Sequence, residues 1–230
     1  MRNPPFVFQA RNELLDNLRS ELTKAHAEDF FSKRLQSVAD VVRDSIAGNT
    51  FRAFRIYRNR HPSTVFREWA STHLYKTLEG LKSITDHESY GNYVHESALD
   101  LCTTWRSQMG TEIGYGRSTK LLNLVLKKLA CLKSIDDNVR KRIIGFQHVP
   151  LDSYTIVGLR LLITSLTIPR NATMKFIERP SEYRIVQKYI VDIATEAGVP
   201  PIYYDILAWD MAHPSANNGL QRIANKAGSR

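Results

Sequence analysis

Residues 114–123 read Gly114-Tyr115-Gly116-Arg117-Ser118-Thr119-Lys120-Leu121-Leu122-Asn123. The two glycines are typical of a tight turn, and the leucines after them indicate an apolar helix. A second stretch, residues 148–154, reads His148-Val149-Pro150-Leu151-Asp152-Ser153-Tyr154. Its proline favours an extended segment, and Asp152 is placed to cap the helix that follows. Both stretches therefore predict a turn or an extended segment that leads into a helix.

Outward from these stretches, apolar residues recur at intervals of three and four along most of the chain. This spacing predicts helices over residues 14–22, 31–46, 65–81, 86–109, 120–132, 134–145, 153–166 and 181–197, with a last short helix that carries Trp209. No strand-like alternation recurs. We therefore predict an all-α, two-lobed helical bundle in which residues 1–230 form a single unit, residues 110–166 carry the core motifs, and residues 213–230 form a flexible tail.

Composition limits the class of protein. The chain has 230 residues and 43% hydrophobic content, enough for one substantial core, so global disorder is excluded. No apolar run approaches the roughly 20 residues that cross a bilayer, and the first residues lack a signal-peptide core, so we expect a cytoplasmic protein without membrane contact. Cys102 and Cys131 are the only cysteines, which excludes a disulfide framework and a four-cysteine iron–sulfur or metal site.

The charge balance favours a polyanionic partner. The chain carries 32 Lys and Arg against 23 Asp and Glu, a net charge of +9, with a pI near 9.6. The basic residues gather in three groups that fit phosphate contacts, although each group also fits a merely solvated face. These groups are Arg52, Arg55, Arg58 and Arg60; Arg117, Lys127, Lys128 and Lys133; and Arg140, Lys141 and Arg142.

The order of turn, lysine helix, extended segment and capping aspartate resembles the helix-hairpin-helix superfamily of DNA glycosylases. Val149-Pro150-Leu151-Asp152 is similar to the segment before the aspartate of that superfamily, and Lys120 begins the expected helix. The separation of 152 − 120 = 32 residues resembles the archaeal 8-oxoguanine glycosylase branch more than the endonuclease III group. The usual Leu-Pro-Gly-Val-Gly hairpin is absent here, and Gly110-Thr111-Glu112-Ile113-Gly114-Tyr115-Gly116 takes its place.

The resemblance implies excision of a damaged or modified base from double-stranded DNA, with no metal and no cofactor. Lys120 would be the nucleophile and Asp152 would stabilise the oxocarbenium-like transition state. A lysine attacks only when neutral, and its ordinary pKa is about 10.4, so the site must favour the uncharged amine. The resulting Schiff base would permit strand cleavage, which makes AP-lyase activity expected. Oxidised guanine in repair, or glucosylated hydroxymethylcytosine in defence against phage, is the candidate substrate.

Further residues follow from the same resemblance. Backbone contacts to DNA are expected from Gly114, Gly116, Arg117 and Ser118. The base pocket or the wedge that fills the gap left by a flipped base is expected among Tyr115, Phe146, Gln147, His148, Trp209 and Asp210. Asp205 also lies near Trp209, although a solvated or capping carboxylate is the commoner role for such a residue.

Two other classes of protein fit the sequence. A non-catalytic helical DNA-binding protein would use the hairpin and the basic groups for backbone contacts and would leave no abasic product. An α-helical interaction or virion protein would not prefer DNA. Lone lysines after a turn and lone aspartates before a helix are mostly solvated and capping residues, so the joint order of Lys120 and Asp152 carries the catalytic interpretation.

Overall fold

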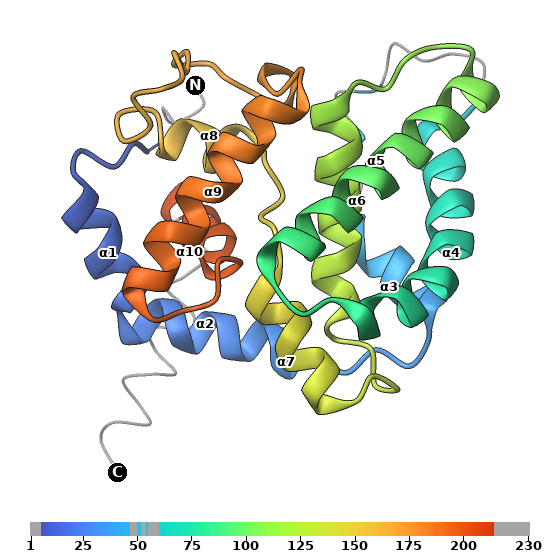
Figure 1. The fold of residues 1–230 in the computed structure, drawn as a ribbon, viewed down its shortest axis with the longest axis horizontal. Helices are drawn as coiled ribbons and strands as arrows, with labels where there is room; N and C mark the ends of the chain where they lie inside the picture. Colours follow the sequence, from blue (N-terminus) through green and yellow to red (C-terminus); the bar gives the residue numbers. More distant parts are fainter. Residues whose placement is uncertain (1–5, 47–49, 52–53, 55–59, 214–230) are drawn as a thin grey trace.

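The computed structural model describes residues 6–46, 50–51, 54 and 60–213 (Figure 1). Within these residues the regular elements are helices, and the only β-type pairing is one isolated bridge, between Leu35 and Leu132. The helices are α1 (Arg11–Arg19), α2 (Glu21–Ser32), α3 (Val38–Ser45), α4 (Pro62–Gly80), α5 (His87–Met109), α6 (Tyr115–Leu129), α7 (Asp137–Phe146), α8 (Ser153–Gly158), α9 (Pro180–Ala197) and α10 (Tyr203–Ala212), with short 3-10 helices η2 (Leu81–Ser83) and η3 (Met174–Phe176). The predicted all-α class is confirmed.

The helices sort into two groups that lie side by side (Figure 1). The first group joins the two ends of the described chain, because α1 and α2 pack with α8, α9 and α10. The second group contains α3 to α7, with α5 and α6 in close contact along their lengths. The chain crosses from the first group to the second between α2 and α3, and it returns between α7 and α8. The face where α6 meets the first group is therefore assembled from distant parts of the sequence.

Local signals in the sequence account for the boundaries of several helices. α5 is preceded by the N-cap Asp86, whose carboxylate accepts the backbone N–H of Ser89, and it is followed by the C-cap Gly110 in the left-handed conformation. α9 has Pro180 in its first turn and is followed by the C-cap Gly198, also left-handed. These capping residues fix the ends of both helices, and the helices predicted over residues 86–109 and 181–197 are confirmed.

Two predicted helices are shorter than the spacing indicated. The helix expected over residues 153–166 ends at Gly158, and turns follow. Gly158 packs closely against α10, since an added Cβ would lie 2.6 Å from the Tyr204 hydroxyl. The helix expected over residues 31–46 is interrupted between Ser32 and Val38. Arg34 closes α2 by donating to the carbonyls of residues 31–33, and Leu35 pairs with another segment of the chain. Contacts distant in sequence therefore override the local periodicity.

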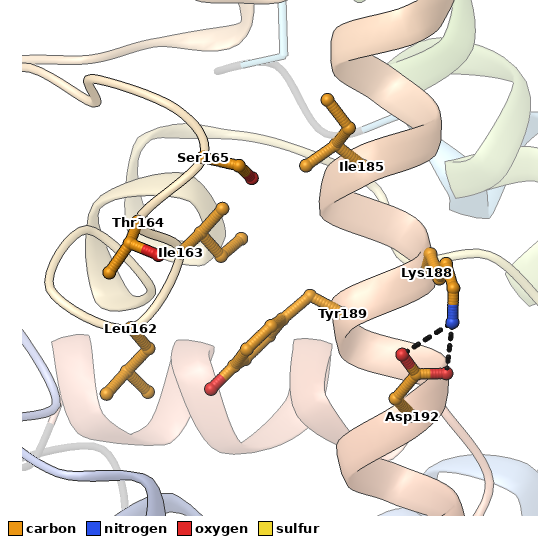
Figure 2. A pocket seen from close by; sticks show the side chains of 8 residues that line it. All are labelled: Leu162, Ile163, Thr164, Ser165, Ile185, Lys188, Tyr189 and Asp192. Atoms are coloured by element: carbon orange, nitrogen blue, oxygen red, sulfur yellow. Dashed lines mark hydrogen bonds and ion pairs between the residues drawn. The ribbon is translucent and has the colours of Figure 1, made fainter.

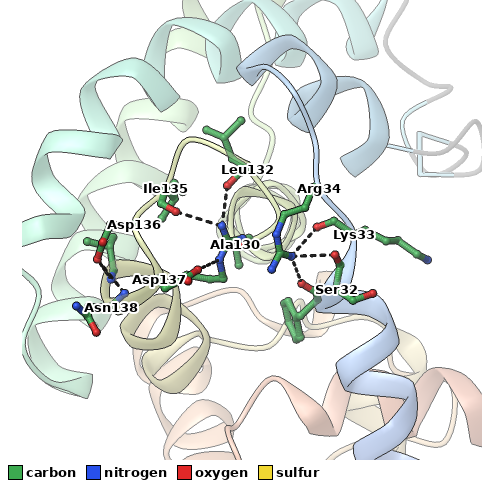
Figure 3. A network of polar contacts seen from close by, with 12 residues as sticks. Ser32, Lys33, Arg34, Ala130, Leu132, Ile135, Asp136, Asp137 and Asn138 are labelled. Carbon is green, nitrogen blue, oxygen red and sulfur yellow. Dashed lines mark hydrogen bonds and ion pairs between the residues drawn. The ribbon is translucent and has the colours of Figure 1, made fainter.

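The crossing between the groups is held by backbone pairing at Leu35, and the guanidinium groups of Arg34 and Arg140 bond carbonyls of the two connections that pair there (Figure 3). Leu35 donates its N–H to the Cys131 carbonyl, and its own carbonyl accepts from Lys133, so the α2–α3 and α6–α7 connections run together. Arg140 is buried and donates to the carbonyls of Ala130, Leu132 and Ile135 after the end of α6. Arg140 thus acts on the protein's own backbone, which corrects its assignment to a phosphate-binding group.

The start of α6 packs closely on η3. Gly116 donates its N–H to the Ile177 carbonyl at 2.9 Å, and a Cβ built on Gly116 would lie 2.0 Å from the Met174 carbonyl oxygen. Only a glycine permits this approach of two backbones. The segment after Pro169 is therefore tied to the first turn of α6.

We expect Gly116→Ala to lower the free energy of unfolding by about 1–3 kcal/mol, because the Met174 carbonyl oxygen cannot move aside without shifting η3. Gly145→Ala is the matched control, since Gly145 lies in α7 with no atom within 4 Å of an added Cβ. That change should stabilise the protein by roughly 0.5–1 kcal/mol. Urea unfolding of both variants measures the difference, and equal midpoints would contradict the packing described.

No helix among the described residues is long and apolar enough to cross a membrane.

Candidate active site

Lys120 and Asp152 lie together where the two groups of helices meet. The Lys120 Nζ is 3.7 Å from the Asp152 Oδ2, and the two side chains are 16% and 24% exposed. Lys120 comes from the second turn of α6, and Asp152 directly precedes α8. An amine and a carboxylate are therefore held as a partly buried ion pair, although 32 residues separate them in the sequence. The structure brings together the two residues that the sequence singled out.

The two oxygens of Asp152 have different roles. Oδ1 accepts the backbone N–H groups of Tyr154 and Thr155 at 2.9 and 3.2 Å, while the Thr155 hydroxyl accepts the Asp152 N–H at 2.8 Å. This reciprocal arrangement is a capping box, so the predicted cap is confirmed. The cap fixes the carboxylate plane and leaves Oδ2 to face Lys120. One side chain thus ends the extended segment and supplies a negative charge to the site.

Lys120 belongs to a polar stripe along one face of α6. Lys120, Asn123 and Lys127 are spaced by three and four residues, so they share one face of α6. Their partners belong to the first group of helices: Asp152 before α8, Tyr183 on α9 and Asp205 on α10. Leucine and valine positions of α6 are buried in the core. This polar stripe therefore forms three polar contacts between the two groups.

Lys127 and Asp205 form a second lysine–aspartate pair. The Lys127 Nζ donates to the Asp205 Oδ2 at 2.7 Å, and the side chains are 12% and 15% exposed. Burial raises the pKa of the Asp205 carboxyl, an effect that the nearby Lys127 opposes. Asp152 and Lys120 also act electrostatically on Asp205, so the two pairs form one cluster. Asp205 is thus the partner of a partly buried ion pair rather than the solvated or capping carboxylate that the sequence favours. The spacing of the polar stripe indicates that Lys127 shares the face of Lys120, but it does not indicate that Asp205 covers that face.

Aromatic rings adjoin this cluster. Trp209 is 56% exposed, although it is one of the largest apolar side chains, and it lies one turn after Asp205 on α10. Its ring stacks on His213 with centroids 4.1 Å apart and meets Tyr154 edge-on at 6.3 Å. Tyr154 is two residues beyond Asp152. The exposed Trp209 ring therefore contacts the helix that Asp152 caps, through Tyr154.

The residues predicted to contact the DNA backbone are only partly accessible in this structure. Gly114 is exposed, with φ of +82°. Gly116 is buried with its N–H given to Ile177, and the Ser118 hydroxyl is buried and donates to the Tyr115 carbonyl. Arg117 donates to the Ile113 carbonyl, and its guanidinium lies 5.5 Å from the Phe54 ring centroid. Gly116 and Ser118 are thus occupied by the protein itself, which argues against both as phosphate ligands.

Several residues predicted for the base pocket lie inside the protein. Tyr115 is buried beside His95, and burial raises the pKa of its phenol to about 12. Gln147 is fully buried, and His148 is 7% exposed, with its pKa lowered by burial to about 3. Phe146 packs edge-on against His87. Tyr115, Gln147 and His148 are core residues in this structure, and Phe146 is partly buried against the core, which argues against these four as residues of an open base pocket.

Asp210 also differs from its expected role. Its Oδ2 lies 2.5 Å from the Nδ1 of His26 on α2, and both side chains are under 20% exposed. The pair ties α2 to α10 rather than presenting a carboxylate to solvent. Of the basic groups, Arg52, Arg55 and Arg58 lie outside the described residues, and Lys127 is engaged by Asp205. Within the described residues, Lys127 is thus committed to an internal ion pair rather than to a phosphate contact.

A separate pocket lies between the connection after α8 and the outer face of α9, with a volume of about 370 Å³ (Figure 2). Isoleucine, leucine and tyrosine side chains dominate its lining, and Lys188 bonds Asp192 at its rim. None of the residues of the Lys120 cluster lines it. No group of three or more His, Cys, Asp or Glu among the described residues is arranged to hold a metal ion.

No family model, curated protein or solved structure matches this chain.

Proposed function

We propose that this protein is a DNA glycosylase with AP-lyase activity, built as a two-lobed helix-hairpin-helix fold. The observation that carries the proposal is the Lys120 Nζ within 3.7 Å of the Asp152 Oδ2, with Asp152 fixed by its cap. A nucleophile beside an oriented carboxylate is the minimum needed to break a sugar–base bond with covalent capture.

The pair supports a two-stage reaction. The Lys120 amine, after losing its proton, attacks C1′ of the target nucleotide, and the glycosidic bond breaks with its electron pair leaving on the base, which is then protonated. Asp152 stabilises the positive charge that develops on the sugar, because its Oδ2 faces the site while Oδ1 is held by backbone N–H groups. The opened sugar and Lys120 then form a Schiff base, from which β-elimination of the 3′ phosphate cleaves the strand.

A duplex base reaches this pair only if its nucleotide is flipped out of the helix. The exposed ring of Trp209, beside Tyr154 and His213, supplies a stacking surface for such a base. The net charge of +9 supports attraction to a polyanion. DNA bearing a damaged or modified base is thus the proposed substrate.

We expect Trp209→Ala to raise the KM for modified DNA by about 10–100-fold, since stacking on one aromatic ring contributes ~1–3 kcal/mol. Folding stability should change little, because the ring is 56% exposed. Tyr75→Ala is the control, since Tyr75 is an aromatic residue of α4 that is 67% exposed and lies in the second group of helices. Equal KM values for the two variants in steady-state assays would remove Trp209 from substrate binding.

The proposal is tested by incubating the protein with duplexes that each carry one oxidised, deaminated, alkylated or glucosylated base. Mass spectrometry of the supernatant then detects any free base. Release of oxidised guanine would indicate repair, and release of glucosylated hydroxymethylcytosine would indicate defence against phage. Salt-sensitive DNA binding without release of any base would favour the non-catalytic DNA-binding alternative instead.

A further inference from the structure

The segment that carries Asp152 is held by a side chain rather than by secondary structure. Residues 147–152 form neither helix nor strand, and Pro150 has no N–H to offer. Gln187 of α9 satisfies both backbone groups of Val149: its Oε1 accepts the Val149 N–H at 3.0 Å, and its Nε2 donates to the Val149 carbonyl at 2.7 Å. Gln187 is 2% exposed. The amide therefore acts as a neighbouring strand would, three residues before Asp152.

One turn earlier on α9, Tyr183 connects the same segment to the lysine helix. The Asn123 Nδ2 donates to the Tyr183 hydroxyl at 2.8 Å, and this hydroxyl lies 3.0 Å from the His148 Nδ1. All three side chains are buried. Asn123 is three residues after Lys120, and His148 is four residues before Asp152. Tyr183 thus bonds one residue near each member of the ion pair.

We propose that Gln187 and Tyr183 are positioning residues that set the separation of Lys120 and Asp152. This inference rests on the proposed function, because it assigns these residues to the same reaction. α9 acts on the ion pair through other residues. It fixes the extended segment through Val149 and His148, and it fixes α6 through Asn123. Misplacement of a reacting group by about 1 Å can cost ~100-fold in rate, so a loosened segment should slow chemistry rather than DNA binding.

Two variants of Gln187 test the inference. Gln187→Leu removes both hydrogen bonds to Val149, and Gln187→Glu keeps the shape of the side chain. A protonated glutamic acid offers one donor and one acceptor, as the amide does, whereas a carboxylate offers only acceptors and faces the Val149 carbonyl. A buried carboxyl has a raised pKa, so protonation is reached at mild pH.

We expect Gln187→Leu to lower the single-turnover rate of base release at least ~10-fold with the Kd for DNA unchanged. Relative to the wild-type protein at each pH, Gln187→Glu should recover as the pH falls, and Gln187→Leu should not. Gln147→Leu is the matched control. Gln147 is a buried glutamine two residues before Val149, but its amide has no hydrogen-bond partner among the described residues. The inference would be overturned if Gln187→Leu released the base at the same single-turnover rate as Gln147→Leu. It would also be overturned if the rate of Gln187→Glu, divided by the wild-type rate, did not vary with pH.

Amide hydrogen exchange separates this inference from the proposed function. The Val149 N–H should exchange faster in Gln187→Leu than in Gln147→Leu, whether or not the wild-type protein releases any base. If the wild-type protein releases no base from any duplex, the proposed function fails, and the role of Gln187 in catalysis fails with it. Unchanged exchange at Val149 would overturn the positioning contact itself while leaving the function of Lys120 and Asp152 open to its own test.

Discussion

Lys120→Gln is expected to abolish covalent capture of DNA. When borohydride reduces the wild-type reaction, the Schiff base between the amine and the opened sugar becomes a permanent crosslink. Glutamine has no nucleophilic amine, so the yield should fall by at least ~100-fold. The Lys120 Nζ is the amine that lies beside the Asp152 carboxylate at 3.7 Å. Denaturing gel electrophoresis of the trapped mixture measures the yield directly.

The control for this substitution is Lys133→Gln. Lys133 follows α6 and is exposed, so its loss removes one positive charge without touching the pair. It should trap DNA as the wild-type protein does, apart from a small change in salt dependence. Persistent trapping in Lys120→Gln would show that another amine, such as Lys127, performs the attack. Because Lys120 is only 16% exposed, folding of the variant is verified by its unfolding midpoint.

Asp152→Asn is expected to slow base release by ~100–1,000-fold while leaving DNA affinity and folding nearly intact. The asparagine oxygen can still accept the N–H groups of Tyr154 and Thr155, because asparagine is as good a helix cap as aspartate. What is lost is the negative charge of Oδ2 toward Lys120 and the sugar. The substitution therefore separates the electrostatic role of Asp152 from its structural one.

Single-turnover release of the base, together with the unfolding free energy, measures both roles. Asp152→Ala should be as slow as Asp152→Asn and also less stable, by roughly 1 kcal/mol, because it removes the cap. If Asp152→Asn released the base at the wild-type rate, the carboxylate would have no part in the reaction. If only Asp152→Ala were slow, Asp152 would be a helix cap and nothing more.

The parts of the fold that follow from nearest neighbours in the chain could be predicted from the sequence. Asp86, Gly110 and Gly198 bound their helices as expected, because caps and left-handed glycines act over a few residues. The Asp152 cap belongs to the same class, since its partners are two and three residues away. The all-α class followed from spacing alone.

The contacts that complete the candidate site could not be predicted in this way. Lys127 and Asp205 are 78 residues apart, and Gln187 and Val149 are 38 apart. Helical periodicity shows that Lys127 lies on the face of Lys120, but it carries no information about which helix covers that face. The same limit explains the errors at Gly116 and Ser118, because nothing near them in sequence indicates that η3 packs on the start of α6.

The net charge could be read from the sequence, but the partners of the basic residues could not. The net charge of +9 favours a polyanion, yet Arg140 donates to carbonyls of the protein's backbone and Lys127 is paired with a carboxylate. A count of basic residues cannot distinguish such internal contacts from a surface that binds phosphate. The position of Lys120 opposite Asp152 is a more specific indication of function than the charge, because it joins two residue types that one reaction requires.

The most direct test of the account is to identify the residue that becomes attached to DNA. The wild-type protein is reduced with borohydride on a duplex whose modified base it releases, and the crosslinked peptide is sequenced by mass spectrometry. We predict one adduct, on Lys120, in the peptide that begins α6. An adduct on any other amine, or base release with no adduct at all, would contradict the assignment of Lys120 as the nucleophile.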